Sequence, residues 1–359
     1  IKYVDGMDLH GVIKAGLEDF ELEYIGCKSA DMILENGGNI DGIAISLCDF
    51  TDKGFLKENA SQIFRDAMSV ADRYNAYIVI DTENVKKASV LEQIIDECVN
   101  EIAASDVNVF IENGYTDDNG RFYHNDYSEG SRLVELTDKL NLLAGCDKFG
   151  ICINVGHANL LGINVRDMVR VCGKKTGIMH INDNDGKGDY HQMPYTFTTG
   201  RGLLSTDWGN IIGDLSRTGF DGRFVFNVEG TFKTPAKLHK SMAELLEAMY
   251  EEWIESCFKT EEYLADDGKK IILFGAGRMA LNYMQNWGDK YPPAFLVDNN
   301  SEIQGQERWG IPVKSPDEIL NVPESERNVW ICNMYYDAIG AQLDSMGVEY
   351  RCYWDHYYM

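Results

Sequence analysis

Residues 149–158 read Phe-Gly-Ile-Cys-Ile-Asn-Val-Gly-His-Ala, and residues 177–183 read Gly-Ile-Met-His-Ile-Asn-Asp. Each stretch is a short apolar run that ends on amide, imidazole or carboxylate side chains. Short apolar runs of this length predict buried strands, and in parallel barrels the working groups stand at the carboxyl ends of the strands. The two stretches therefore predict neighbouring parallel strands whose polar ends share one rim.

The same unit recurs along the first two thirds of the chain. Helical segments with apolar residues at i, i+3, i+4 and i+7 separate the β-rich runs, as in Ala60–Arg73, Leu91–Ala104 and Ser131–Leu143. Strand–helix alternation implies right-handed crossovers onto a parallel sheet, and eight such units form a closed (β/α)8 TIM barrel. We place this α/β barrel at residues 1–264, closed by a helical stretch over 235–264. The predicted strands are 1–4, 20–25, 42–48, 76–81, 107–112, 149–155, 177–181 and 223–228.

A second, smaller α/β unit is predicted at 268–359. The pattern restarts with a strand over 271–274, and further strands are expected at 294–297, 329–332 and 349–353, with a helix at 338–346. The first strand runs into a G-x-G-x-x-A turn, and an acid ends the next strand about twenty residues on, which is the context of a Rossmann-like nucleotide site. The alternative, that the glycines only permit a tight turn, stays open. The nucleotide-binding candidates are Gly275, Gly277, Ala280 and Asp298.

Composition narrows the classes of partner. The chain of 359 residues carries 33 Lys and Arg against 58 Asp and Glu, a formal charge of −25, which repels a nucleic-acid backbone. Its nine cysteines form no C-x-x-C pair, so we expect reduced thiols and a cytoplasmic location. No apolar stretch approaches the ~20 residues that a membrane span needs. We therefore expect a small-molecule partner and neither nucleic acid nor membrane.

Carboxylates and imidazoles collect at the predicted strand ends. Side chains that project from neighbouring strand ends converge on one point, and this mixture suits a divalent ion such as Mn, Mg, Co or Zn. Taken singly, a His or Glu at a strand end is usually a capped or solvated residue, whereas several at one rim favour a functional site. The candidates are Glu112, Asn154, His157, His180, Asp183, Asp189, His191 and Glu229.

The order of these motifs resembles the xylose isomerase-like TIM-barrel superfamily, which contains sugar and sugar-phosphate isomerases and epimerases and also endonuclease IV. The stretch 200–202, Gly-Arg-Gly, belongs to the same pattern. The resemblance implies His157 as a substrate contact and Asp183, Asp189 and His191 as a second metal or substrate site. The implied metal ligands are Glu112, Asn154, His180 and Glu229, and Asn154 stands where the family has Asp.

The resulting expectation is a metal-dependent sugar or sugar-phosphate isomerase or epimerase that acts through an enediolate. Glu112 and Glu229 would be the acid–base pair, His157 would polarise the substrate oxygen, and residues 115–128 could form a lid over the rim. Barrels of this type are often paired, so a homodimer is one expectation.

Two alternatives remain open. One is a non-catalytic carbohydrate or nucleotide-sugar binding protein with a degenerate metal site, which Asn154 favours. The other is an endonuclease IV-like phosphodiesterase, which the acidic charge and the lack of histidines at the earlier strand ends disfavour. Residues 295–316 resemble nucleotide-sugar-binding Rossmann-like domains, which implies a nucleotide or nucleotide-sugar ligand for the second unit.

Overall fold

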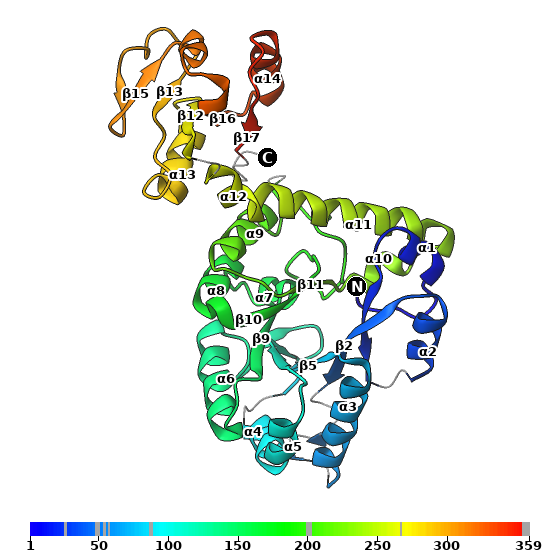
Figure 1. The fold of residues 1–359 in the computed structure, drawn as a ribbon. Coiled ribbons are helices and arrows are strands. Elements are labelled where there is room, and N and C mark those ends of the chain that lie inside the picture. Colours follow the sequence, from blue (N-terminus) through cyan, green and yellow to red (C-terminus); the bar gives the residue numbers. More distant parts are fainter. Residues whose placement is uncertain are drawn as a thin grey trace. The chain divides into compact units, whose positions relative to one another are not determined.

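A computed structural model describes residues 1–24, 27–46, 51–52, 55–56, 58–85, 89–198, 203–265 and 268–353. The predicted Gly-Arg-Gly motif at 200–202 lies outside these residues, and so do the last residues of the strands expected at 20–25 and 42–48. The chain forms two compact units, Ile1–Tyr250 and Glu251–Met359 (Figure 1). The sequence predicts the boundary between residues 264 and 268, whereas the structure separates the units within a long helix. No described helix is long and apolar enough to cross a bilayer.

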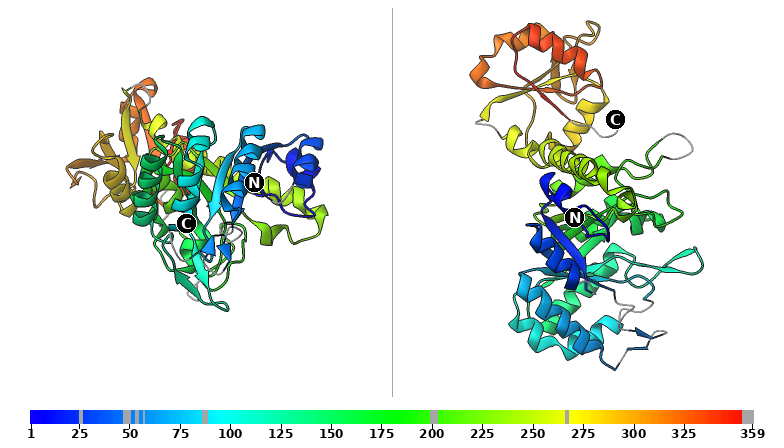
Figure 2. Two further views of the ribbon diagram at one scale, coloured as in Figure 1. Left: turned by 90° about the horizontal axis from the view of Figure 1, so that it is seen from below. Right: turned by 90° about the vertical axis from the view of Figure 1, so that its right-hand side faces the viewer.

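The first unit is built on a seven-stranded, wholly parallel sheet, with its helices outside the strands (Figures 1 and 2). Seven of the eight predicted strands are present within a few residues of their expected bounds. Isoleucine and valine side chains on both faces explain why these runs are buried strands. In sheet order the strands are β1 Asp19–Glu23, β2 Asn39–Ser46, β5 Tyr77–Asp81, β6 Val109–Glu112, β9 Phe149–Asn154, β10 Thr176–Ile181 and β11 Arg223–Phe226.

The eighth predicted strand, 1–4, is reduced to a single parallel bridge between Lys2 and Glu21. Lys2 donates its backbone N–H to Phe226 O of β11 at 3.1 Å, and Tyr3 N–H donates to Glu21 O of β1 at 2.9 Å. Residues 1–3 thus lie between the first and last strands of the sheet. By bonding to both β11 and β1, these residues nearly close the TIM-barrel-like sheet.

The helices cover the barrel because each has one apolar stripe. Helix α3 buries Phe64, Met68 and Ala71 and ends at Asn75, whose φ of 54° is left-handed. The helix predicted at 91–104 is broken at Cys98 into two shorter helices. The helices are α1 Leu9–Lys14, α2 Cys27–Glu35, α3 Ala60–Tyr74, α4 Ser89–Glu97, α5 Val99–Ala104, α6 Gly130–Ala144, α7 Val155–Leu160, α8 Val165–Cys172, α9 Trp208–Arg217, α10 Glu229–Phe232 and α11 His239–Trp253.

Two hairpins leave the barrel between its strands. In one, β3 (Thr51–Asp52) pairs antiparallel with β4 (Phe55–Leu56), and in the other, β7 (Tyr115–Asp117) pairs antiparallel with β8 (Phe122–His124). The β7–β8 hairpin occupies the segment for which a lid is predicted.

The second unit holds a separate mixed sheet of six strands. Only β14 is antiparallel to its neighbour, and two apolar clusters lie within the unit. The sequence analysis missed the pair β14–β15, which is short and lies at the edge of the sheet. In sheet order the strands are β14 Glu307–Arg308, β15 Ile311–Lys314, β13 Phe295–Val297, β12 Lys270–Phe274, β16 Arg327–Ile331 and β17 Arg351–Cys352; the helices are α12 Thr260–Leu264, α13 Arg278–Trp287 and α14 Tyr336–Ser345.

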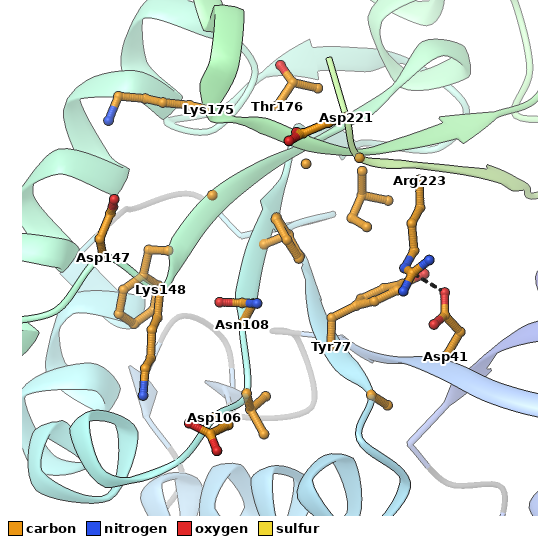
Figure 3. A pocket seen from close by; sticks show the side chains of 18 of the residues that line it. Asp41, Tyr77, Asp106, Asn108, Asp147, Lys148, Lys175, Thr176, Asp221 and Arg223 are labelled. Atoms are coloured by element: carbon orange, nitrogen blue, oxygen red, sulfur yellow. Dashed lines mark ion pairs between the residues drawn. The ribbon is translucent and has the colours of Figure 1, made fainter. Parts of the chain in front are cut away.

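The amino end of the barrel contains a cavity of about 760 Å³ (Figure 3). Its inner wall includes Tyr77 and Phe110, whose ring centroids lie 5.8 Å apart, and its rim includes the ion pair of Arg223 with Asp41 at 2.8 Å. Because active sites of such barrels lie at the carboxyl ends of the strands, this cavity is at the opposite end from the candidate site.

Candidate active site at the carboxyl ends of the strands

A buried ion-pair cluster lies inside the barrel mouth, and we call Glu21, Glu112, Asn154 and His180 the inner cluster. His180 on β10 places Nδ1 2.8 Å from Glu112 Oε1 and Nε2 3.1 Å from Glu21 Oε2. All three side chains are buried. Since both ring nitrogens face carboxylate oxygens, the imidazole donates two hydrogen bonds as a cation.

The inner cluster perturbs the protonation of its members. Burial alone would lower the pKa of His180, but the surrounding Cys152, Glu21 and Glu112 hold it well above its ordinary value. Burial opposes ionisation of Glu112, yet the charge and hydrogen bond of His180 lower the pKa of that carboxyl. The cluster is therefore a charged unit at neutral pH.

Asn154 joins the inner cluster through its amide nitrogen. Its Oδ1 accepts hydrogen bonds from His157 N at the start of α7, at 3.2 Å, and from Asn182 Nδ2, at 2.9 Å. Its Nδ2 donates to Glu112 Oε1 at 2.7 Å and lies 3.0 Å from His157 Nε2. The backbone of Asn154 is fixed on both sides by Asn113, which accepts from its N–H and donates to its C=O.

A second group of potential ligands lies beside the first, and we call His157, Asp189 and His191 the outer cluster. Asp189 Oδ2 lies 2.9 Å from His191 Nε2 and 3.7 Å from His157 Nε2. The Nδ1 atoms of the two rings lie 2.8 Å from Asn113 O and 3.1 Å from Asn227 O. Hydrogen bonds from Nδ1 to a carbonyl orient Nε2 for a metal, as is common for ligand histidines.

Two observations indicate that the outer cluster suits a divalent ion. The ligand atoms lie within 4.8 Å of one another, and Asp189 Oδ1 is buried without a hydrogen-bond partner among the described residues. Burial lowers the pKa of His157, but the hydrogen bond to Glu83 and the charges of Asp189 and Glu112 raise it to about 10. The carboxylates around the His157 imidazole therefore favour a proton or a metal cation at its Nε2 atom.

The predicted four-residue ligand set does not fit a cation in this structure. Asn154 turns its only ligand oxygen toward His157 N and Asn182, and presents an N–H donor to Glu112. Glu229, at the start of α10, is 49% exposed and pairs with Lys233 at 2.7 Å. Cys152 lies near Glu112 and His180, but both nitrogens of that histidine already face carboxylates. Of the four predicted ligands, only Glu112 and His180 bring potential ligand atoms close together, with Glu112 Oε1 2.8 Å from His180 Nδ1.

Asp183 does not join either cluster. Its Oδ1 accepts hydrogen bonds from Thr206 Oγ1 at 2.8 Å and from Asn184 N, and its backbone pairs with that of Gln192. Asp183 therefore holds the loop that carries Asp189 and His191. His191 itself has a left-handed φ of 47°, an uncommon backbone conformation that this loop stabilises.

The sequence analysis missed several acids and one base at the mouth. Glu21 and Glu23 alternate with apolar residues in β1, and this period-2 pattern could have placed Glu21 inside the barrel, whereas Glu23 is exposed at the end of the strand. Asp81 ends β5 by the same rule that identified Glu112. Glu83 Oε1 lies 3.2 Å from His157 Nε2, and Lys2 Nζ lies 3.6 Å from Glu23 Oε1.

In the second unit, the predicted nucleotide residues lie around one turn after β12. Gly275 has φ +123°, and a Cβ there would stand 2.4 Å from Cys332 O, so the turn requires glycine. The Asp298 carboxylate accepts hydrogen bonds from Ala276 N at 3.0 Å and from Asn300 N at 2.9 Å. It therefore stabilises the turn through backbone N–H groups. A Cβ on Gly277 would meet no atom within 4 Å, whereas Ala280 is buried in the apolar core.

The sequence profile of the xylose isomerase-like TIM barrel matches residues 29–255. The chain belongs to the xylose isomerase-like TIM barrel family. A solved L-ribulose 3-epimerase superposes with a TM-score of 0.55 at 14% identity, covering 73% of this chain and 92% of the other.

Two further solved structures are similar to the barrel. The 3-keto-D-glucoside 4-epimerase of E. coli gives a TM-score of 0.49 at 11% identity, over 69% of this chain and 97% of that one. The D-allulose 3-epimerase of Methylomonas sp., in complex with D-allulose, gives 0.49 at 12%, over 68% and 89%. No curated protein sequence matches this chain. At these identities the likeness concerns the fold.

Proposed function

We propose that this member of the xylose isomerase-like family is a sugar isomerase or epimerase. The observation that carries the proposal is the meeting of the inner and outer clusters at the mouth of the barrel, where this fold places its chemistry. Reactions of this class move a proton at a carbon beside a carbonyl, and they need paired acids and bases around a polar substrate.

A divalent cation in the outer cluster is part of the proposal. His157, Asp189 and His191 would hold it through imidazole nitrogen and carboxylate oxygen, a donor set that suits Zn, Mn or Co. Such an ion, when bound, supplies Lewis-acid polarisation of a substrate carbonyl or hydroxyl oxygen.

We assign the proton transfers to Asp81 and Glu112. The strands β5 and β6 pair Ile80 with Ile111, so the next residues, Asp81 and Glu112, are neighbours at the mouth. Burial and the charges of Glu83 and Glu112 raise the pKa of Asp81 to about 7, whereas the pKa of Glu112 is lowered. Two carboxyls with pKa values driven apart are the arrangement of an acid and a base. Glu229, the partner expected from the sequence, would have to leave Lys233 to take part.

Tyr115 connects the predicted lid to this chemistry. Its hydroxyl donates to Asp189 Oδ2 at 3.1 Å, and its ring packs edge-on against His157 with centroids 4.9 Å apart. Burial and nearby carboxylates raise the pKa of Tyr115, so it keeps its proton. The β7–β8 hairpin thereby contacts two of the three proposed ligands.

The proposal is tested by hydrogen exchange at carbon. The protein is incubated in D2O with Mn²⁺ or Co²⁺ and a panel of ketoses and aldoses, and deuterium at the carbon beside the carbonyl is followed by NMR. We expect exchange that falls at least about 100-fold in Glu112→Gln and in His191→Ala, and that chelation abolishes. The exposed change Glu135→Gln is the matched control.

Measurements of sugar binding and of DNA cleavage, made beside the exchange assay, separate the alternatives. Saturable sugar binding without exchange would contradict the proposal and support the non-catalytic binding protein, and cleavage of abasic-site DNA would support the phosphodiesterase. A loss of exchange in Glu229→Gln but not in Asp81→Asn would restore the acid–base pair expected from the sequence.

For the second unit we propose a Rossmann-like domain that binds a nucleotide or nucleotide sugar. In chain order the parallel strands run 3-2-1-4-5 across the sheet, and the Gly275 turn follows strand 1, where the order reverses. Gly277→Val has open space for its side chain and should fold normally while blocking an approaching phosphate. Calorimetry with UDP-sugars and NAD on the full chain should show binding that this variant loses, and equal heats for both proteins would contradict the site.

A further inference from the structure

We infer that the inner cluster works without a metal ion, because Asn154 places an amide N–H group where a ligand oxygen would be needed. The inference concerns only the inner position and rests on the proposed function for the cation of the outer cluster.

The orientation of the Asn154 side chain follows from its neighbours. Oδ1 accepts from a backbone N–H, that of His157, which cannot act as an acceptor, so the oxygen must face the start of α7. Asn182 Nδ2 donates to the same oxygen, and Asn113 fixes the backbone on both sides. The remaining atom, Nδ2, faces Glu112 Oε1 at 2.7 Å. An aspartate here would use one oxygen to cap α7 and still offer the second to a cation, whereas asparagine has only one.

The charges of the inner cluster are already compensated by the protein. His180 donates one hydrogen bond to Glu112 Oε1 and one to Glu21 Oε2, and Tyr77 OH donates to the same oxygen of Glu21. Glu21 Oε1 has no hydrogen-bond partner among the described residues. Lys2 and Glu21 form a parallel backbone bridge, so their side chains leave the same face of the sheet, and the Lys2 ammonium pairs with Glu23 Oε1 at 3.6 Å. The Lys2 side chain is only 21% exposed. His180 thus places one positive charge between the two carboxylates, and Lys2 adds a second that it shares with Glu23.

The inner cluster therefore holds Glu112 by protein donors alone. Asn154 Nδ2 and His180 Nδ1 both approach Oε1 of Glu112, at 2.7 and 2.8 Å. Oε1 is thus engaged by two donors, which leaves Oε2 as the oxygen for a substrate proton. Asn154 is in this view a positioning residue, and the cation of the outer cluster acts beside Glu112 without being bound by it.

The test is a count of bound metal. Purified full-length protein, freed of metal by chelation, is dialysed against Zn²⁺ or Mn²⁺, and the metal per chain is measured by mass spectrometry. We expect one equivalent in the natural protein and two in Asn154→Asp. The control Asn164→Asp changes the N-cap of α8 in the same way at an exposed site, and it should leave the count at one.

A second variant makes the result independent of how well Asn154→Asp folds. Glu112→Gln in the natural background should retain its one equivalent, because the inner cluster contributes no ligand, whereas His191→Ala should lose it. A loss of metal in Glu112→Gln, or equal counts in Asn154→Asp and the natural protein, would overturn the inference. A natural protein that binds no metal, with one equivalent in Asn154→Asp, would refute the outer site of the proposed function and still support the inference.

Discussion

Buried charges at the barrel mouth are paired between strands, with one exception. Glu21 and Glu112 share the imidazolium of His180, and removing any one of them would leave an uncompensated charge in the interior. Asp81 makes no ion pair among the described residues: its Oδ1 accepts a hydrogen bond from Glu83 N at 2.8 Å, and burial and the carboxylates of Glu83 and Glu112 raise its pKa more than the charge of His157 lowers it. This difference explains why the pKa of Asp81 is raised to about 7 while that of Glu112 is lowered.

Because its pKa is raised, Asp81 should make the free energy of unfolding decrease as pH rises, the opposite of what a paired carboxylate does. Its pKa is about 7 in the folded protein against 3.8 as the ordinary value, so the folded state binds more protons between these limits. By linkage, the free energy of unfolding falls as pH rises from about 4 to about 7. Asp81→Asn, which mimics the protonated acid, should stabilise the protein by about 1–2 kcal/mol at pH 8 and little at pH 4, since a three-unit shift sets a ceiling of about 4 kcal/mol. Urea titrations at the two pH values check this, and an equal effect at both would refute it.

At the scale of elements, one buried acid joins two helices of the barrel wall. Asp214 on α9 receives Arg166 Nε at 2.7 Å and Arg170 Nη2 at 2.8 Å from α8, and also Arg217 of its own helix. The Asp214 side chain is 3% exposed, while the arginines remain partly solvated. Burial raises the pKa of Asp214, but the hydrogen bonds and charges of Arg166 and Arg217 outweigh this effect and lower the pKa.

Removing this charge should loosen the contact between α8 and α9. Asp214→Asn keeps the volume but loses the ion pairs, and we expect a loss of about 2–3 kcal/mol in the free energy of unfolding. Asp167→Asn, which removes an exposed partner of Arg170, should cost less than about 0.5 kcal/mol. Denaturant titrations of both variants at pH 7 make the comparison, and equal losses would show that the Asp214 cluster contributes no more than a surface pair.

The strands of the barrel were predictable from local sequence because apolar runs and their polar ends are encoded within a few residues. This rule placed Glu112 and His180 near the carboxyl ends of β6 and β10, where the structure has them. The side-chain directions were not, because they depend on contacts across the barrel: Asn154 turns its oxygen to α7, and Glu229 turns to Lys233. The local pattern of β1 could place Glu21 on the inner face, but it could not predict the pairing with His180, which is 159 residues away in sequence.

At the scale of the whole molecule, the charge of −25 adds to an acidic mouth. Acids there outnumber the bases. The acids are Glu21, Glu23, Asp81, Glu83, Glu112 and Asp189, and the bases are Lys2, His157, His180 and His191. A field of this sign repels anionic substrates over roughly one Debye length and has little effect on neutral ones. The sequence left open whether the substrate is a sugar or a sugar phosphate, and the charge favours the neutral sugar.

This preference can be measured with a ketose and its terminal phosphate ester. If the phosphate has no dedicated partner, kcat/KM for the ester should be at least about tenfold below that for the free sugar at 10 mM salt. The gap should narrow as salt is raised to 0.3 M, because screening acts on the charged substrate alone. A neutral pair, such as the ketose and its deoxy analogue, controls for general salt effects. A higher kcat/KM for the ester at low salt would show that a phosphate-binding group overrides the field, and it would move the proposal to a sugar-phosphate enzyme.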